Sequence, residues 1–260
     1  MKKKTKRCCV GIIARLGSKR LHNKHLIKIN GDAIIGFLIK RLQYYFRKNN
    51  LDSFLEIMIL TGNLTTNQSL GIVAKQFGVP IYYGNDNNIP RRMLDAVIKH
   101  DFDTIITVDG DDIFCSPEGI KEVHDCLVNG NEYVKTTHLP FGMNSMGLTR
   151  AFLRHSVENT TRENLQTGWG WIFNDDKCKI LRDSIEPDKR LRFTLDYTED
   201  LSFFKRIIML KSDVISSESD ALIDFVIKNK IYLENAHLNK EYWENFKTER
   251  SSDIRGAKNG

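Results

Sequence analysis

The chain has 260 residues, of which 41% are hydrophobic and 28% charged, a composition that supports one large α/β domain with a sizeable core. No apolar stretch approaches the roughly 18 to 20 residues that span a bilayer, and five cysteines without a C-x-x-C pair argue against a disulfide framework or a structural zinc site. The formal net charge is +6, but the cations are spread along the chain without a nucleic-acid-binding motif. We therefore expect a cytoplasmic protein with neither nucleic acid nor a membrane as partner.

Strand-like and helix-like runs alternate through the first half of the chain. The sequence predicts strands at 8–13, 54–60, 80–83 and 104–108, and helices at 33–46, 69–77 and 91–99 and from Pro117 onward. Ser116 is a suitable N-cap and Pro117 a suitable first helical residue, so the start of that last helix is well marked. This β-α-β rhythm predicts a Rossmann-like α/β fold, with a mostly parallel central sheet and helices on both faces.

The second half departs from this rhythm. Residues 140–180 contain glycines, a Met/Asn-rich stretch and Trp169-Gly170-Trp171, and we interpret them as an insertion that forms a lid or a dimer arm. A strand is predicted at 191–195, followed by an acidic loop and a helix through Phe203 and Ile207. We expect a single domain over 1–246 and a polar, disordered tail over 247–260.

A loop rich in Arg, Lys, Gly and Ser follows the first predicted strand. Such a loop brings backbone N–H groups and positive charge to a polyphosphate, although a basic loop after a strand is also often a solvated turn. Neither G-x-G-x-x-G nor G-x-x-x-x-G-K-[ST] is present in it. If the loop binds phosphate, it relies on Arg and Lys more than on glycine.

Carboxylates follow two of the predicted strands. Three aspartates lie in the segment 109–112, and Asp196 follows the strand at 191–195. Because ligands bind at the carboxyl edge of an open parallel sheet, both groups are expected there, and carboxylates facing a triphosphate need a divalent cation between them. The alternative is helix capping, which is the favoured interpretation for Glu199 and Asp200.

In their order along the chain, these motifs resemble the cytidylyltransferases that activate sugar acids. The resemblance is to the spore-coat polysaccharide biosynthesis branch, with the CMP-Kdo and CMP-N-acetylneuraminate synthetases as more distant relatives. It runs from about Cys9 to Leu210 and rests on A-R-L-G-S-K-R-L-x-x-K, G-N-D near residue 85, Gly110-Asp111, Arg162-Glu163 and L-D-Y-T-E-D-L.

The resemblance implies a fold of the nucleotide-diphospho-sugar transferase type, a homodimer, and CMP transfer from CTP to a sugar acid, with Mg²⁺ as cofactor. The products would be pyrophosphate and a CMP-sugar for surface glycan biosynthesis. The implied catalytic residues are Arg15, Lys19 and Lys24, the metal ligands Asp111 and Asp196, and the sugar-binding residues Arg162 and Glu163. The implied nucleotide-binding residues are Ala14, Arg15, Gly17, Ser18, Lys19, Arg20, Lys24, Gly84, Asn85, Arg91 and Gly110.

The chain departs from the family pattern at two places. His22-Asn23 replaces a Pro-Gly, which changes the stiffness of the loop before Lys24, and Tyr197-Thr198 replaces the Thr-Pro of D-T-P-E-D. Three alternatives stay open: a nucleotidyltransferase for a sugar phosphate or alditol phosphate, a glycosyltransferase, and a catalytically inactive nucleotide-binding protein of the same fold.

Overall fold

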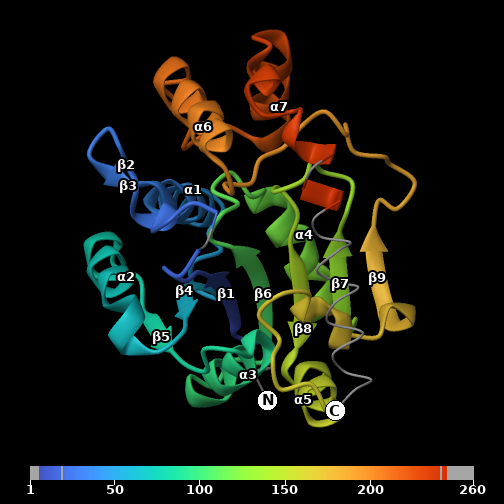
Figure 1. Ribbon diagram of the computed structural model, residues 1–260. Helices are drawn as coiled ribbons and strands as arrows, with labels where there is room; N and C mark the ends of the chain where they lie inside the picture. Colours follow the sequence, from blue (N-terminus) through green and yellow to red (C-terminus); the bar gives the residue numbers. More distant parts are fainter. Residues whose placement is uncertain (1–5, 19, 241, 245–260) are drawn as a thin grey trace.

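A seven-stranded sheet forms the centre of the molecule (Figure 1). The structure, a computed structural model, describes residues 6–18, 20–240 and 242–244. The strands, in sheet order, are β5 (Ile81–Tyr83), β4 (Leu55–Thr61), β1 (Cys8–Ile13), β6 (Thr104–Asp109), β8 (Met146–Thr149), β7 (Tyr133–Thr136) and β9 (Cys178–Leu181). Neighbouring strands pair in parallel except where β8 meets β6 and β7. The predicted mostly parallel sheet is confirmed, and a short ribbon of β2 (Lys28–Ile29) and β3 (Asp32–Ala33) lies outside it.

Helices cover both faces of the sheet, as predicted. Along β1, Val10 and Ile12 pack into one hydrophobic core and Cys9 and Ile13 into the other, because successive side chains of a strand point to opposite faces. The first core also takes side chains from α1 (Ile34–Lys48), α2 (Leu64–Phe77), α4 (Pro117–Val128), α6 (Thr198–Leu210) and α7 (Ser219–Lys228). The second takes side chains from α3 (Ile89–Lys99) and α5 (Arg150–Glu158). Four short 3₁₀ turns are η1 (Lys24–Leu26), η2 (Trp169–Ile172), η3 (Asp175–Lys177) and η4 (Ile231–Glu234).

Side-chain caps mark the starts of α2 and α4. At the predicted start of α4, the hydroxyl of Ser116 accepts the backbone N–H of Gly119 at 3.0 Å. Helix α2 begins earlier than the apolar run suggests, because the side chain of Asn63 accepts the N–H of Thr66 at 3.0 Å. Leu64 is exposed and Asn67 is the buried residue of the first turn, so a search for buried apolar periodicity misses this turn.

The predicted strand at 191–195 is wrong. Its side chains are all buried, but its backbone hydrogen bonds go to two different loops: the N–H of Phe193 to the carbonyl of Phe141 at 2.7 Å, and the N–H of Leu195 to the carbonyl of Asp111 at 3.1 Å. Only one isolated bridge, Phe141 to Arg192, is formed. Burial of an extended loop thus produces the same apolar pattern as a strand.

The predicted insertion is narrower than 140–180. Within this range, β8 and β9 are strands of the central sheet and α5 packs against it. The part that lies outside the sheet and its covering helices is the segment between α5 and β9. Within the described residues, no helix combines the length and apolar character of a transmembrane span. The predicted tail at 247–260 lies outside the described residues.

Candidate active site

A pocket of about 480 Å³ opens where β1 and β6 end. Six of the residues predicted to bind the nucleotide line it, namely Ala14, Arg15, Gly17, Ser18, Arg20 and Lys24. The exposed side chain of Arg15 and the half-exposed side chain of Arg20 give this wall positive charge. Lys19 lies outside the described residues.

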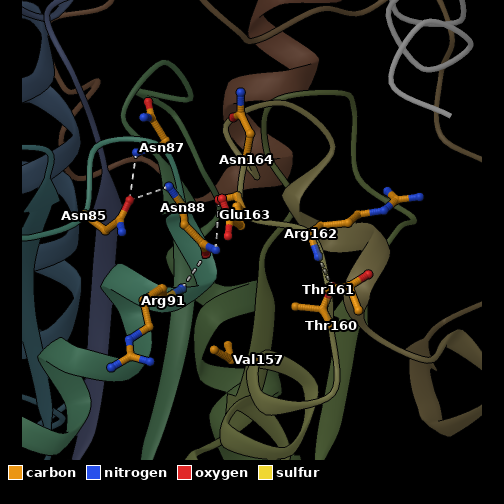
Figure 2. Close-up of a pocket in the computed structure, with 10 residues that line it drawn as sticks. All are labelled: Asn85, Asn87, Asn88, Arg91, Val157, Thr160, Thr161, Arg162, Glu163 and Asn164. Atoms are coloured by element: carbon orange, nitrogen blue, oxygen red, sulfur yellow. Dashed lines mark hydrogen bonds between the residues drawn. The ribbon is translucent and has the colours of Figure 1, made fainter. Parts of the chain in front are cut away.

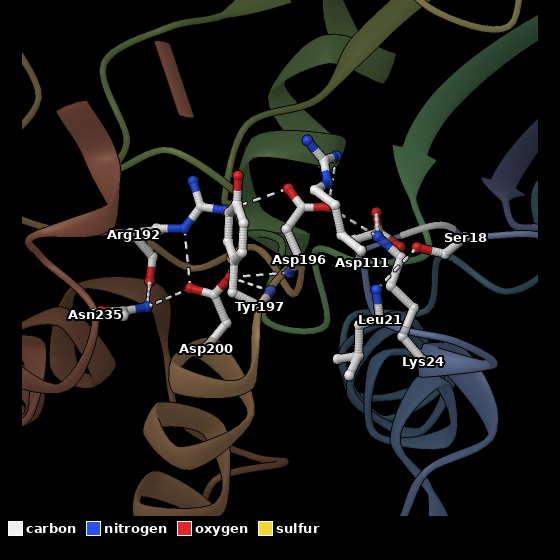
Figure 3. A network of polar contacts seen from close by, with 10 residues as sticks. Ser18, Leu21, Lys24, Asp111, Arg192, Asp196, Tyr197, Asp200 and Asn235 are labelled. Carbon is white, nitrogen blue, oxygen red and sulfur yellow. Dashed lines mark hydrogen bonds and ion pairs between the residues drawn. The ribbon is translucent and has the colours of Figure 1, made fainter. Parts of the chain in front are cut away.

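The two acidic loops meet at the ammonium group of Lys24 (Figure 3). Lys24 Nζ donates to Oδ2 of Asp111 and, at 3.0 Å, to Oδ1 of Asp196. Arg20 Nη2 donates to the same oxygen of Asp196 at 2.8 Å. The predicted convergence of Asp111 and Asp196, 85 residues apart in the sequence (196 − 111), is present in the structure.

Backbone hydrogen bonds hold the loops together at this point. The N–H of Gly110 donates to the carbonyl of Ile13 at 2.8 Å, which joins the end of β6 to the end of β1. The bond from Leu195 to Asp111 brings the second acidic loop to the same place. Asp196 is thus positioned by the loop after β6, and not by a strand of its own.

The charges of the site are strongly coupled. Burial alone would raise the pKa of Asp196, but Lys24, Arg20 and Arg192 outweigh it and hold that pKa below its usual value. Burial would likewise lower the pKa of Lys24, and the two carboxylates reverse this effect. The ion pair is therefore fully charged at neutral pH.

Asp109, at the end of β6, also lines the pocket. Its side chain opens to the pocket, yet the surrounding protein and the negative charge of Asp111 raise the pKa of its carboxyl to about 7. Burial also raises the pKa of Asp112. Two carboxyl groups of the loop after β6 thus bind a proton more readily than a free aspartate does.

Asp111 and Asp196 are the carboxylates that could hold a divalent cation, although Asp111 lines the pocket and Asp196 is buried beside it. Their oxygens already share one cation, the ammonium of Lys24, and Mg²⁺ takes one or two carboxylates and completes its shell with water and phosphate oxygens. Among the described residues, no group of three or more His, Cys, Asp and Glu side chains gathers in the manner of an all-protein metal site. A metal here would need ligands from the substrate.

Four predicted nucleotide-binding residues do not line this pocket. Asn85 and Arg91 line a neighbouring cleft. Gly84 and Gly110 are packing positions: a Cβ at Gly84 would lie 2.8 Å from Cγ of Arg92, and one at Gly110 would lie 2.9 Å from Cβ of Ala14.

Arg162 and Glu163 also line the neighbouring cleft, which encloses about 670 Å³ (Figure 2). Figure 2 shows the Asn85–Arg91 segment on one side of this cleft and Thr160–Asn164 on the other. The side chain of Asn88 donates to the carbonyl of Glu163 at 3.3 Å and joins the two sides. The predicted sugar-binding pair is therefore next to the pocket of Asp111 but not inside it.

Several residues of the pocket are not among the predicted binding residues. The resemblance places the stretch 84–92 near the nucleotide and names Arg91, but Arg92 lines the pocket and Arg91 does not. Trp169 lines both this pocket and a small cavity of about 190 Å³ that contains Lys135 and Asn144. Tyr242 reaches the pocket from the C-terminal part of the chain. Helix periodicity could have identified Arg92 as inward-facing, but nothing in the local sequence marks Tyr242.

The chain is similar to known proteins over most of its length. A family model described as "Cytidylyltransferase" matches residues 10–237. An uncharacterized protein of Methanocaldococcus jannaschii is 29% identical over 234 residues, which cover 85% of this chain and 90% of that protein.

Two solved structures share the fold. A cytidylyltransferase from Leptospira borgpetersenii superposes with a TM-score of 0.77 at 21% identity, over 88% of this chain and 98% of that one. A CMP:2-keto-3-deoxy-manno-octonic acid synthetase complexed with CTP gives a TM-score of 0.57 at 12% identity, over 78% of this chain and 98% of that one.

Proposed function

The chain belongs to the cytidylyltransferase family, and from this premise we propose that it transfers CMP from CTP to a sugar acid with the help of Mg²⁺. As a member of that family it is a nucleotidyltransferase that uses CTP. The observation that carries the finer proposal is that Asp111 and the basic loop line one pocket, and that buried Asp196 contacts two residues of this lining, Lys24 and Arg20.

The pocket supports this reaction through its charges. Arg15, Arg20 and Lys24 line the wall that follows β1, and they suit a triphosphate and a departing pyrophosphate. The acceptor's hydroxyl oxygen forms a bond to the α-phosphorus, the bond from that phosphorus to the bridging oxygen of the β-phosphate breaks, and the hydroxyl proton is released. The protein has little covalent chemistry to do, so positioning and charge neutralisation dominate.

Asp111 and Asp196 would hold the magnesium ion. Its chemistry there would be to orient the phosphates and to neutralise the charge that develops on them. Lys24 would then exchange a carboxylate partner for a phosphate oxygen of CTP, because all three negative groups compete for one ammonium.

The acceptor and the assembly are further parts of the proposal. Arg162 lines a polar cleft beside the pocket, where a guanidinium suits the carboxylate of a sugar acid. A homodimer and a role in surface glycan biosynthesis follow from the family resemblance. A sugar phosphate or alditol phosphate is the competing acceptor class.

Pyrophosphate release from CTP, UTP, ATP and GTP, each mixed with a panel of sugar acids, sugar phosphates and alditol phosphates, tests the proposal. We expect release only with CTP and a sugar acid in the presence of Mg²⁺. Equal kcat/KM for the nucleotides would contradict the role as a cytidylyltransferase, and turnover with a sugar phosphate alone would contradict the acceptor class.

A further inference from the structure

Both carboxylate oxygens of Asp196 accept hydrogen bonds from cationic side chains (Figure 3). Oδ1 lies 3.0 Å from Lys24 Nζ and 2.8 Å from Arg20 Nη2. Oδ2 accepts from Nη2 of Arg192 at 3.2 Å. The plane of the carboxylate is therefore fixed, and one oxygen is presented toward Lys24 and Asp111.

Arg192 is itself anchored. Its side chain is 0% exposed, and it pairs with both oxygens of Asp200 through Nε at 2.9 Å and Nη2 at 3.2 Å. The side-chain amide of Asn235 donates to Asp200 at 2.9 Å and to the carbonyl of Arg192 at 3.0 Å. The guanidinium also lies 4.6 Å from the ring centroid of Tyr242. This fork-like pairing leaves Arg192 little rotational freedom.

The same network holds the backbone of the acidic loop. Oδ2 of Asp200 accepts the N–H of Asp196 at 2.9 Å and that of Tyr197 at 3.0 Å. The predicted capping role of Asp200 is thus confirmed, but the residue also neutralises Arg192. Backbone and side chain of Asp196 are both fixed by one buried pair.

We propose that Arg192, anchored by Asp200 and Asn235, is a positioning residue that orients Asp196 to bind a divalent cation. Arg192 is fully buried and does not line the nucleotide pocket, whereas Asp196 contacts Lys24 and Arg20, which do, so Arg192 acts through Asp196 and not on the substrate. Partners that orient a metal ligand typically change metal affinity by about 10- to 100-fold. The inference rests on the proposed function, because it needs Asp196 to be a metal ligand.

The test compares two fully buried arginines. Arg192→Lys keeps the charge, but one ammonium lacks the planar fork that holds Asp196 and Asp200 together. Arg41→Lys is the matched control, because Arg41 is also 0% exposed and its guanidinium bonds to the carbonyl of Val214 at 3.1 Å and the hydroxyl of Ser219 at 3.3 Å, away from the pocket.

Binding of Mn²⁺ is measured by electron paramagnetic resonance, with and without a non-hydrolysable CTP analogue, so that no acceptor is needed. Thermal unfolding is measured alongside. We expect both lysine variants to lose thermal stability, but only Arg192→Lys to weaken Mn²⁺ binding, by about 10- to 100-fold. Arg41→Lys should stay within about twofold of the wild type.

The outcomes separate this inference from the proposed function. If Arg192→Lys binds Mn²⁺ as tightly as wild type while Asp196→Asn does not, the positioning role is wrong and the metal site stands. If Asp196→Asn also binds like wild type, the metal site itself is wrong. Should Arg192→Lys fail to fold, Asn235→Ala replaces it, because it frees Asp200 without deleting a charge. It should weaken Mn²⁺ binding severalfold, and wild-type affinity would overturn the inference.

Discussion

Lys24 is the residue on which the charges of the pocket converge. Its side chain is 6% exposed and bridges Asp111 and Asp196, which are 24% and 4% exposed. Without the ammonium of Lys24, the two carboxylates would lie close together with less positive charge beside them. Asp196 would keep its contacts to Arg20 and Arg192, which Asp111 does not share. His22-Asn23 precedes Lys24 in place of Pro-Gly, and Lys24 nevertheless reaches both aspartates.

Lys24→Met should lower the free energy of unfolding by about 3 kcal/mol, since it removes the buried ammonium that Asp111 and Asp196 share. Saturating Mg²⁺ should restore more stability to this variant than to wild type, because a bound ion supplies the missing charge. Denaturant unfolding with and without MgCl₂ measures both effects. Lys40→Met is the control, because Lys40 pairs with Asp32 and is 41% exposed. An equal Mg²⁺ effect in Lys24→Met and wild type would contradict this role of Lys24.

His124 gives the fold a pH dependence away from the pocket. Its ring stacks on Phe54 with centroids 5.0 Å apart, and burial lowers its pKa below the usual 6.5, against the opposing effect of Asp125. The unfolded chain therefore binds a proton at higher pH than the folded chain does. Stability contributed by the neutral imidazole is complete above about pH 6.5 and is lost as the pH falls below it.

As the pH drops from 7 to 5, we expect His124 to lower the free energy of unfolding by at most about 1.4 kcal/mol per pH unit, against the raised pKa values of Asp109 and Asp112, which act in the opposite direction. His124→Leu should therefore lose less stability, or gain more, than the wild type over this range, while His22→Gln, a change at an exposed loop position, should follow the wild type. Urea unfolding at several pH values measures the slopes. Equal slopes in wild type and His124→Leu would rule out His124 as the source.

At the scale of the elements, the segment 191–196 depends on a close approach to the loop at 141–142. Gly142 has a φ of 88°, and a Cβ there would lie 2.4 Å from the backbone carbonyl carbon of Phe193. The contact helps to place the loop that ends in Asp196. Gly130 offers a control, with a φ of 100° and no atom within 4 Å of such a Cβ.

Gly130→Ala should cost about 1 to 2 kcal/mol of stability, through backbone strain alone. Gly142→Ala should cost more and should also reduce CTP turnover, because it must displace the backbone that leads to Asp196. Thermal unfolding and pyrophosphate release measure the two effects. If both variants are equally stable and equally active, the close approach at Gly142 does not position the site.

Cationic side chains line both the cleft and the small cavity beside the pocket. Arg162 lines the cleft with Asn85 and Arg91, and Lys135 lines the small cavity beyond Trp169. Lys135 is already paired with Asp175 at 2.6 Å, which leaves it less available to an acceptor. The proposed acceptor site is therefore the cleft of Arg162.

Arg162→Ala should raise the acceptor's KM by about 10- to 100-fold, the usual worth of a hydrogen bond to a charged group, and leave the KM for CTP within about twofold. Lys135→Ala should change neither value by more than about twofold. Steady-state kinetics with the acceptor found in the panel measure both. The reverse pattern would place the acceptor in the cavity beside Trp169.

At the scale of the whole molecule, the sequence predicts what depends on local pattern. The run at 8–13, the Ser116-Pro117 start and the aspartates of 109–112 all lie where periodicity and strand-end rules put them. Contacts between distant segments were not predictable: Arg192 appears as one more residue of an apolar run until Asp200 and Asn235 surround it.

The strand error at 191–195 has the same origin. The alternation of apolar and polar residues at 191–195 is visible in the sequence, whereas the partners of backbone hydrogen bonds are not. Asp196 nevertheless lies near Asp111, because the backbone hydrogen bond from Leu195 to Asp111 takes the place of the strand pairing that the prediction assumed. Arg91 and Arg92 show how one residue of helix register decides which cation enters the pocket.

The central claim is that Asp111 and Asp196 share one divalent ion that CTP turnover requires. Its most direct test is a Mg²⁺ titration of pyrophosphate release for wild type, Asp111→Asn, Asp196→Asn and the double variant. Each single variant should stay folded and lose most activity, because each loses charge that balances the ion, and the double variant should be far from additive. Full activity in chelator, or an Asp196→Asn variant with unchanged Mg²⁺ dependence, would contradict the shared site.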